Sequence, residues 1–209
     1  MHDVDTAPDS PRGPVVNRRL SQEAFRQLTA GNVINQHRIR DGEPESNPLF
    51  QELYKERDRY YVEAYANMGM ELVQRPGFFY VRSLIEDDNE DPASSAAIRP
   101  LQGVLLVLGR GVLEAGYMFD LLTTHDAGAS QELLEQIGES PTMRQILAAC
   151  YIDRPLPEAA KVALVDRHIA YYNARGHLVL ADAGKAFFND IFREEPGPHY
   201  QASWSLSGC

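Results

Sequence analysis

The chain has few cysteines and no long apolar run. Its 209 residues include two cysteines, Cys150 and Cys209, whose spacing is not that of metal ligands, so neither a disulfide framework nor a zinc site is expected. Cys150 lies in the apolar run ILAACY without a basic neighbour, which favours a buried structural thiol. No apolar run approaches the roughly 18 residues of a membrane span, and acids stand where a signal peptide has basic residues. We therefore expect a cytoplasmic protein without a membrane partner.

Positive charge is also scarce. The chain has 20 Lys and Arg against 30 Asp and Glu, a formal net charge of −10. This charge repels duplex DNA, which carries one negative charge per roughly 1.7 Å. Any DNA binding is therefore expected to be weak, or to occur only within a complex. The acids are densest in IEDDNED, and we predict an acidic linker over residues 85–97 that separates two domains.

Motifs that carry catalysis or bind a cofactor are missing. The glycines of GRGVLEAG, residues 109–116, do not have the spacing of a dinucleotide fingerprint and are better suited to close helix packing. His125 precedes Asp126 and His168 follows Asp166, but residues two apart on a helix do not face one another. No nucleophile elbow or P-loop occurs. We expect no catalytic residues, no cofactor and no metal.

The first half of the chain predicts a helix that runs into a β-hairpin. After a disordered arm, residues 1–19, a helix is predicted from Ser21 to near Gly31, followed by a loop over residues 37–48. Apolar residues then recur at helical spacing from Pro48, with Asn47 before it as the N-cap. Gly69 is expected to end this helix, so the pattern predicts one long amphipathic helix. The segments MELV and FFYV are then predicted to pair across QRPG, because Pro-Gly suits the centre of a type II turn.

The second half repeats this order. LPEAAKVALVDRHIAYYNARG, residues 156–176, predicts another helix closed by Gly176, and HLVL and KAFF predict a second hairpin. Placing Gly69 on Gly176 aligns the two units without a gap. A helical core whose last helix runs into a two-stranded hairpin is the winged-helix plan, although a helix followed by a hairpin also occurs in many other α+β folds.

The predicted fold is therefore a mainly helical α+β structure with two tandem winged-helix domains. Its predicted segments are the disordered arm 1–19, the N-terminal winged-helix domain 20–84, the acidic linker 85–97, the C-terminal winged-helix domain 98–195 and the tail 196–209.

The first hairpin supplies the candidate contact residues. In FFYV, Phe78 and Tyr80 are expected on one face of the strand and Phe79 on the other, so both faces need cover. Either the hairpin packs fully onto its own domain, or another chain completes one face, which makes Phe78, Phe79 and Tyr80 candidate partner or dimer contacts.

The cations of the helix and hairpin units are the candidate DNA contacts, although as scattered surface charges they need no function. They are Lys55, Arg57, Arg59, Arg75, Arg82, Arg167, Arg175 and Lys185.

The chain resembles the MukE-like subunits of bacterial condensins, in the MksE branch. The resemblance is carried by NPLFQELYKERDRYYVEAYANMGMELVQRPGFFYVRS, IRPLQGVLLVLGRGVLEAGYMF and ARGHLVLADAGKAFFNDIF, and covers roughly residues 21–195. It implies two tandem winged-helix domains, a homodimer, and binding to a kleisin-type subunit that links the dimer to an SMC-type ATPase. It also implies a nucleoid-associated, non-catalytic role in chromosome condensation and partition or in defence against plasmids.

A free-standing winged-helix transcription regulator is the alternative. Such a regulator reads DNA with a basic helix, whereas residues 157–176 balance their cations against Glu158 and Asp166. The apolar hairpins also suit protein partners. The preferred hypothesis is the non-catalytic condensin subunit.

Overall fold

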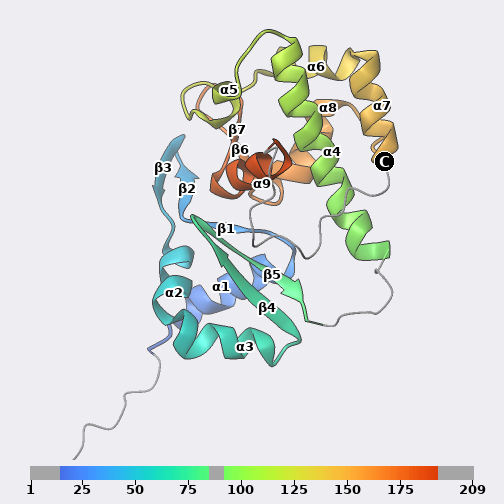
Figure 1. Cartoon of the computed structure of the whole chain (residues 1–209). Coiled ribbons are helices and arrows are strands. Elements are labelled where there is room, and N and C mark those ends of the chain that lie inside the picture. The colour runs from blue at the N-terminus through green and yellow to red at the C-terminus, as the bar shows by residue number, and fades with distance from the viewer. Residues whose placement is uncertain (1–14, 85–91, 193–209) are drawn as a thin grey trace, which may run out of the picture.

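A computed structural model describes residues 15–84 and 92–192 of the chain. They form a mixed α+β structure that is mostly helical, with small antiparallel sheets, as the sequence predicts. Figure 1 shows the N-terminal half at one end of the molecule and the C-terminal half at the other. Among the described helices, none is long and apolar enough to cross a membrane. The predicted tail, 196–209, lies outside the described residues.

Helix α1 (Arg18–Thr29) begins three residues before the predicted start at Ser21. The cause is Asn17, whose side chain accepts hydrogen bonds from two backbone N–H groups of the first turn. The last two residues of the predicted disordered arm are therefore helical, and residues 1–14 lie outside the described part of the chain. The helix ends before Gly31, which has a φ of 80°, as the sequence predicts.

The predicted loop over residues 37–48 is wrong for most of its length. Strands β2 (His37–Arg40) and β3 (Glu43–Ser46) form an antiparallel hairpin. Asp41 and Gly42 connect them with φ values of 52° and 86°. Asp-Gly is a preferred pair for a two-residue hairpin turn in which both central residues need positive φ. The polar composition of the segment concealed this turn signal.

The long helix of the first half is confirmed as three consecutive segments. These are α2 (Pro48–Glu56), a π-helical turn η1 (Arg57–Tyr61) and α3 (Val62–Ala66). The side chain of Asn47 accepts a hydrogen bond from the Leu49 N–H at 3.0 Å, which caps the helix as predicted.

The first hairpin is also confirmed. Strands β4 (Met70–Arg75) and β5 (Phe78–Ser83) pair in the expected register, with Val73 opposite Tyr80. Gly77 has a φ of 86°, which position i+2 of a type II turn requires. Strand β1 (Ile34–Asn35) pairs with the other edge of β5, so the sheet order is β1-β5-β4.

The C-terminal half is built around its first helix, α4 (Pro92–Glu114). This helix includes residues 92–97, which we predicted to lie in the acidic linker, whereas 85–91 are outside the described residues. Gly109 and Gly111 allow close packing, because a Cβ there would collide with Phe192 and Ile137 respectively. The elements that follow are α5 (Asp120–Thr123), α6 (Gln131–Glu139), α7 (Pro141–Ala149), α8 (Leu156–Ala160), the π-helical turn η2 (Lys161–Val165), β6 (Ala170–Tyr172), β7 (Leu178–Leu180) and α9 (Asp182–Phe192).

The second helix is shorter than predicted, and the hairpin after it lies one strand earlier in the chain. The helix expected over residues 156–176 ends with η2, and His168 follows it with a φ of 61°. Strands β6 and β7 then form the hairpin, so Gly176 lies in its turn. The segment KAFF, predicted as a strand, belongs to α9. Gly176 therefore corresponds to Gly77 in the first hairpin and not to Gly69.

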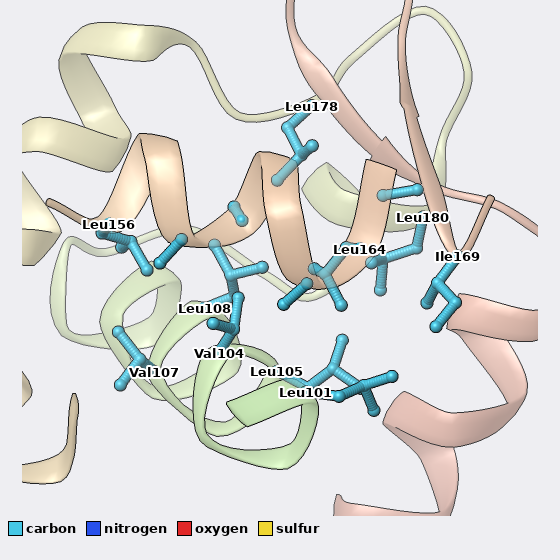
Figure 2. Close-up of a cluster of buried hydrophobic side chains, with 14 of the residues drawn as sticks. Leu101, Val104, Leu105, Val107, Leu108, Leu156, Leu164, Ile169, Leu178 and Leu180 are labelled. Atoms are coloured by element: carbon cyan, nitrogen blue, oxygen red, sulfur yellow. The ribbon is translucent and has the colours of Figure 1, made fainter. Parts of the chain in front are cut away.

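Each half has its own hydrophobic core. The core of the C-terminal half packs α4 against α8, η2 and β7, and Figure 2 shows their side chains pointing toward one another. Cys150 is buried in this core, as the sequence predicts. The N-terminal core lies between α1, the long helix and the sheet. Strand β5 contributes to both cores, because Phe79 belongs to the N-terminal one and Phe78 to the other.

Candidate interaction surfaces

The hairpin aromatics that we predicted as partner contacts are covered by their own chain. Phe79 is fully buried, and its ring centroid lies 5.0 Å from that of Phe50 in the N-terminal core. Phe78 is fully buried on the opposite face, where its ring centroid lies 5.3 Å from that of Phe187 on α9. Tyr80 packs on the same Phe187 ring at 6.5 Å. The two-faced pattern is correct, but Phe78 and Phe79 offer no surface to a partner because the chain fills both faces itself.

A buried asparagine joins the two halves. The side-chain amide of Asn35 on β1 donates to the His168 carbonyl at 2.6 Å, and its oxygen accepts from the Ala183 N–H at 2.9 Å. Asn35 is only 6% exposed. The backbone N–H of Val33 also donates to the Arg167 carbonyl at 3.1 Å. Because these buried polar groups are paired across the junction, they hold the halves in one arrangement.

The two hairpin arginines lie next to carboxylates. Arg75 makes two hydrogen bonds to Asp190 on α9, at 2.7 and 3.3 Å, and its guanidinium lies 5.8 Å from the centroid of the Phe78 ring. Arg82 pairs with Glu71 across the hairpin. Each of these carboxylates offsets much of the positive charge with which its arginine would attract a phosphate.

The cations of the long helix do not gather on one face. Lys55 is well exposed, and its Nζ lies 3.6 Å from the buried Glu56 carboxylate. Arg57 pairs with Asp58, and Arg59 is exposed. Lys55 and Arg59 are four residues apart and lie near one another, whereas Arg57 is two residues from each and points in a different direction, so the three cations do not form a single phosphate-binding patch.

The remaining candidate cations lie in the C-terminal half. Arg167 precedes β6, Arg175 is exposed in the β6–β7 turn, and Lys185 is half-buried on α9. The eight predicted DNA contacts are therefore distributed over several elements of both halves. DNA contact by any of them stays a prediction.

Two buried tyrosines form the main cluster of perturbed titratable groups. The Tyr61 hydroxyl donates to Glu52 at 3.1 Å, and the same carboxylate accepts from the Asn17 N–H at 2.8 Å. Burial raises the pKa of Tyr61 to about 12 and raises that of Tyr65 further. Phenols with raised pKa values stay protonated near neutral pH and are poor general acids. Over residues 15–84 and 92–192, no group of three His, Cys, Asp or Glu residues could hold a metal ion.

A cleft of about 470 Å³ lies among α6, α7 and the start of α8. Its lining combines the apolar Leu147 and Leu156 with charges of both signs, including Glu139 and Arg144.

An exposed apolar surface on α4 was not predicted from the sequence. Leu106 and Leu113 on α4 are 36% and 48% exposed, in the described part of the chain. The run LLVLGRGVL is apolar almost throughout, so only the contacts of α4 reveal which of its side chains stay outside. The spacing of seven residues between the two leucines was the one available signal.

The chain also matches a known protein family. The family described as "Condensin complex protein MksE" matches residues 19–192, which includes both halves and the junction between them. No curated protein matches the chain.

Proposed function

The chain belongs to the MksE family of condensin complex proteins, and from this membership we propose that it is a non-catalytic subunit of a bacterial condensin-like complex. In this proposal it dimerises and binds a kleisin-type subunit, which links it to an SMC-type ATPase. The complex organises or partitions the chromosome, or acts against plasmids, and is cytoplasmic and nucleoid-associated. The observation that carries the proposal is the family match over both halves.

The proposal includes two tandem winged-helix domains. In the first half a long helix leads into β4 and β5, and β1 adds a third strand to that sheet. In the second half η2 leads into β6 and β7, and Ala129 makes an isolated β-bridge to Leu178 at the edge of β7. This common order of helix and hairpin is typical of winged-helix domains and supports the proposal.

The proposed role is to bind proteins rather than to carry out a reaction. The net charge of −10 and the pairing of Arg75, Arg82 and Arg57 with carboxylates disfavour strong DNA binding by the chain alone. Since β5 is covered on both faces by its own chain, the proposed dimer rests on the family and no longer on the hairpin.

Co-purification tests the proposed role. Light scattering of the chain alone at tens of micromolar should give twice the monomer mass of 23.4 kDa. Co-expression with a kleisin-type protein and an SMC-type ATPase from the same genome should yield a complex that co-elutes, and omission of the kleisin should release the chain from the ATPase. A monomeric mass would contradict the dimer, and failure to bind the kleisin would contradict the proposed function.

Exchange of Lys55, Arg57 and Arg59 together for Glu should weaken DNA binding by the assembled complex. Each lost phosphate contact should flatten the dependence of log K on log salt by about 0.9, because fewer counterions are released. The chain alone should bind duplex DNA non-specifically, with Kd values of about 10⁻⁴ to 10⁻⁶ M at physiological salt. A titration of DNA over several salt concentrations, alongside a pull-down by the kleisin, measures both effects.

A control with the same change of charge exchanges Arg26, Arg144 and Arg154 for Glu, all of them exposed cations outside the candidate set. It should leave both readouts close to those of the unaltered complex. If the first triple variant abolishes assembly but spares DNA binding, its surface binds the kleisin and the predicted DNA contacts are wrong. Sub-micromolar, sequence-selective binding by the chain alone would favour a transcription regulator.

A further inference from the structure

One face of α4 keeps apolar side chains in contact with solvent. Leu106, Gly109, Arg110 and Leu113 are spaced i, i+3, i+4 and i+7 and therefore share a face of the helix. Leu106 and Leu113 are 36% and 48% exposed, and the Arg110 guanidinium bonds Glu114 at 2.7 Å. The face formed by Leu106, Gly109, Arg110 and Leu113 is called the α4 face below.

Helix α9 ends on the α4 face. The ring of Phe192, the last residue of α9, lies so close to Gly109 that a Cβ there would collide with it. The ring of Phe188 approaches the same glycine from the preceding turn of α9. Along the axis of α4, Gly109 lies between Leu106 and Leu113. The chain that continues beyond Phe192 therefore starts beside the exposed leucines.

The sequence that follows has the composition to cover this face. Residues 193–209, REEPGPHYQASWSLSGC, include Tyr200, Trp204 and Leu206, three side chains with apolar surface. Trp204 is 204 − 192 = 12 residues beyond Phe192. At about 3.3 Å per extended residue, this length can span up to about 40 Å. The two leucines are only about 10 Å apart along the helix, at 1.5 Å per residue.

We propose that segment 193–209 packs on the α4 face of its own chain, with Trp204 covering Leu106 and Leu113. The tether favours this occupant over a separate molecule, because a short linker gives an effective concentration of about millimolar. An aromatic anchor on aliphatic side chains removes apolar surface from water on both partners. The inference goes beyond the proposed function, since it does not depend on a kleisin or on DNA.

Intrinsic fluorescence of the full-length chain tests the proposal. Trp204 is the only tryptophan, so the emission reports on the segment alone. In the unaltered chain we expect emission at a shorter wavelength, and weaker acrylamide quenching, than for N-acetyltryptophanamide. Leu113→Asp should shift the emission to longer wavelength and raise the quenching constant toward that of the free amide. Leu106→Asp should act in the same direction.

The matched control is Val62→Asp, because Val62 is 39% exposed and lies on α3 at the other end of the molecule in Figure 1. It should leave the emission unchanged, and circular dichroism should show that all variants are folded. Leu206→Ser changes the segment itself and leaves the α4 face intact, so it should also raise the quenching constant.

Three results would overturn the proposal. The first is emission and quenching in the unaltered chain equal to those of the free amide. The second is shielding that Leu106→Asp, Leu113→Asp and Leu206→Ser all leave unchanged, which would place the segment elsewhere. The third is shielding that disappears on dilution as light scattering reports dissociation, which would place it on a second copy.

Discussion

The variant Phe79→Asp is expected to lose most or all of the stability of the N-terminal half. Phe79 is fully buried against Phe50, and loss of a buried Phe side chain alone costs about 3–5 kcal/mol. An unpaired carboxylate in the same place adds a desolvation penalty of several kcal/mol. Because a whole domain is stable by only about 5–15 kcal/mol, the two terms together are comparable to the total. Urea and thermal denaturation followed by circular dichroism measure this loss.

Two further experiments distinguish the burial of the carboxylate at residue 79 from a general effect of added charge. Met68→Asp places the same carboxylate just after α3 at a side chain that is 45% exposed, and should change the free energy of unfolding by no more than about 0.5 kcal/mol. Burial raises the pKa of an introduced carboxyl, so acidification should restore part of the stability of Phe79→Asp as that group becomes neutral. An unchanged melting temperature for Phe79→Asp would show that β5 is not packed as described.

Asn35→Leu is expected to have the second largest effect, through the junction of the two halves. Leucine has a similar volume but cannot pair with the His168 carbonyl or the Ala183 N–H, which Asn35 satisfies at 2.6 and 2.9 Å. Each buried group left without a hydrogen bond costs about 1–3 kcal/mol, so we expect a loss of about 2–6 kcal/mol. The loss should appear in the melting temperature and as faster hydrogen exchange at the Ala183 amide.

The control places the same substitution on the surface of α9. Asn189 is exposed, so Asn189→Leu should change the free energy of unfolding by no more than about 0.5 kcal/mol. Asn35→Asp is informative as well, because its carboxylate can still accept from Ala183 but faces the His168 carbonyl with no proton to donate near neutral pH. We expect it to be less stable than the unaltered chain and to recover at low pH. Equally slow exchange at Ala183 in Asn35→Leu would contradict the assigned role of Asn35.

The elements that sequence reasoning predicted well depend on neighbours in the chain. Asn47 caps the helix that Pro48 begins, Gly69 follows the end of that helix, and Gly77 provides the positive φ that the hairpin turn requires. Each signal acts within a few residues, because a cap or a turn is a local set of backbone and side-chain hydrogen bonds. The family resemblance depends in part on the same local patterns and is confirmed over residues 19–192.

The second hairpin was placed wrongly because distant residues decide it. The side chain of Asn173 donates to the carbonyls of His125 and Ala127 and accepts the N–H groups of Arg175 and His177. The first two partners are more than forty residues earlier in the chain, so the turn that they stabilise could not be recognised from the local sequence. The segment KAFF suits a helix as well as a strand, and the apparent repeat favoured the wrong choice.

The sequence by itself determined the mainly helical α+β class, the cap at Asn47, the turn at Gly77, the two-faced pattern of β5 and the family. Only the tertiary structure decided what covers each face of β5, because Phe78 meets Phe187, a residue that is 187 − 78 = 109 positions away. Only the tertiary structure likewise showed that Leu106 and Leu113 stay exposed, because in the sequence they look like any other leucines in an apolar run. Hydrophobic burial is favourable but not directional. An apolar pattern therefore predicts that a face is covered, but it does not predict which segment covers it.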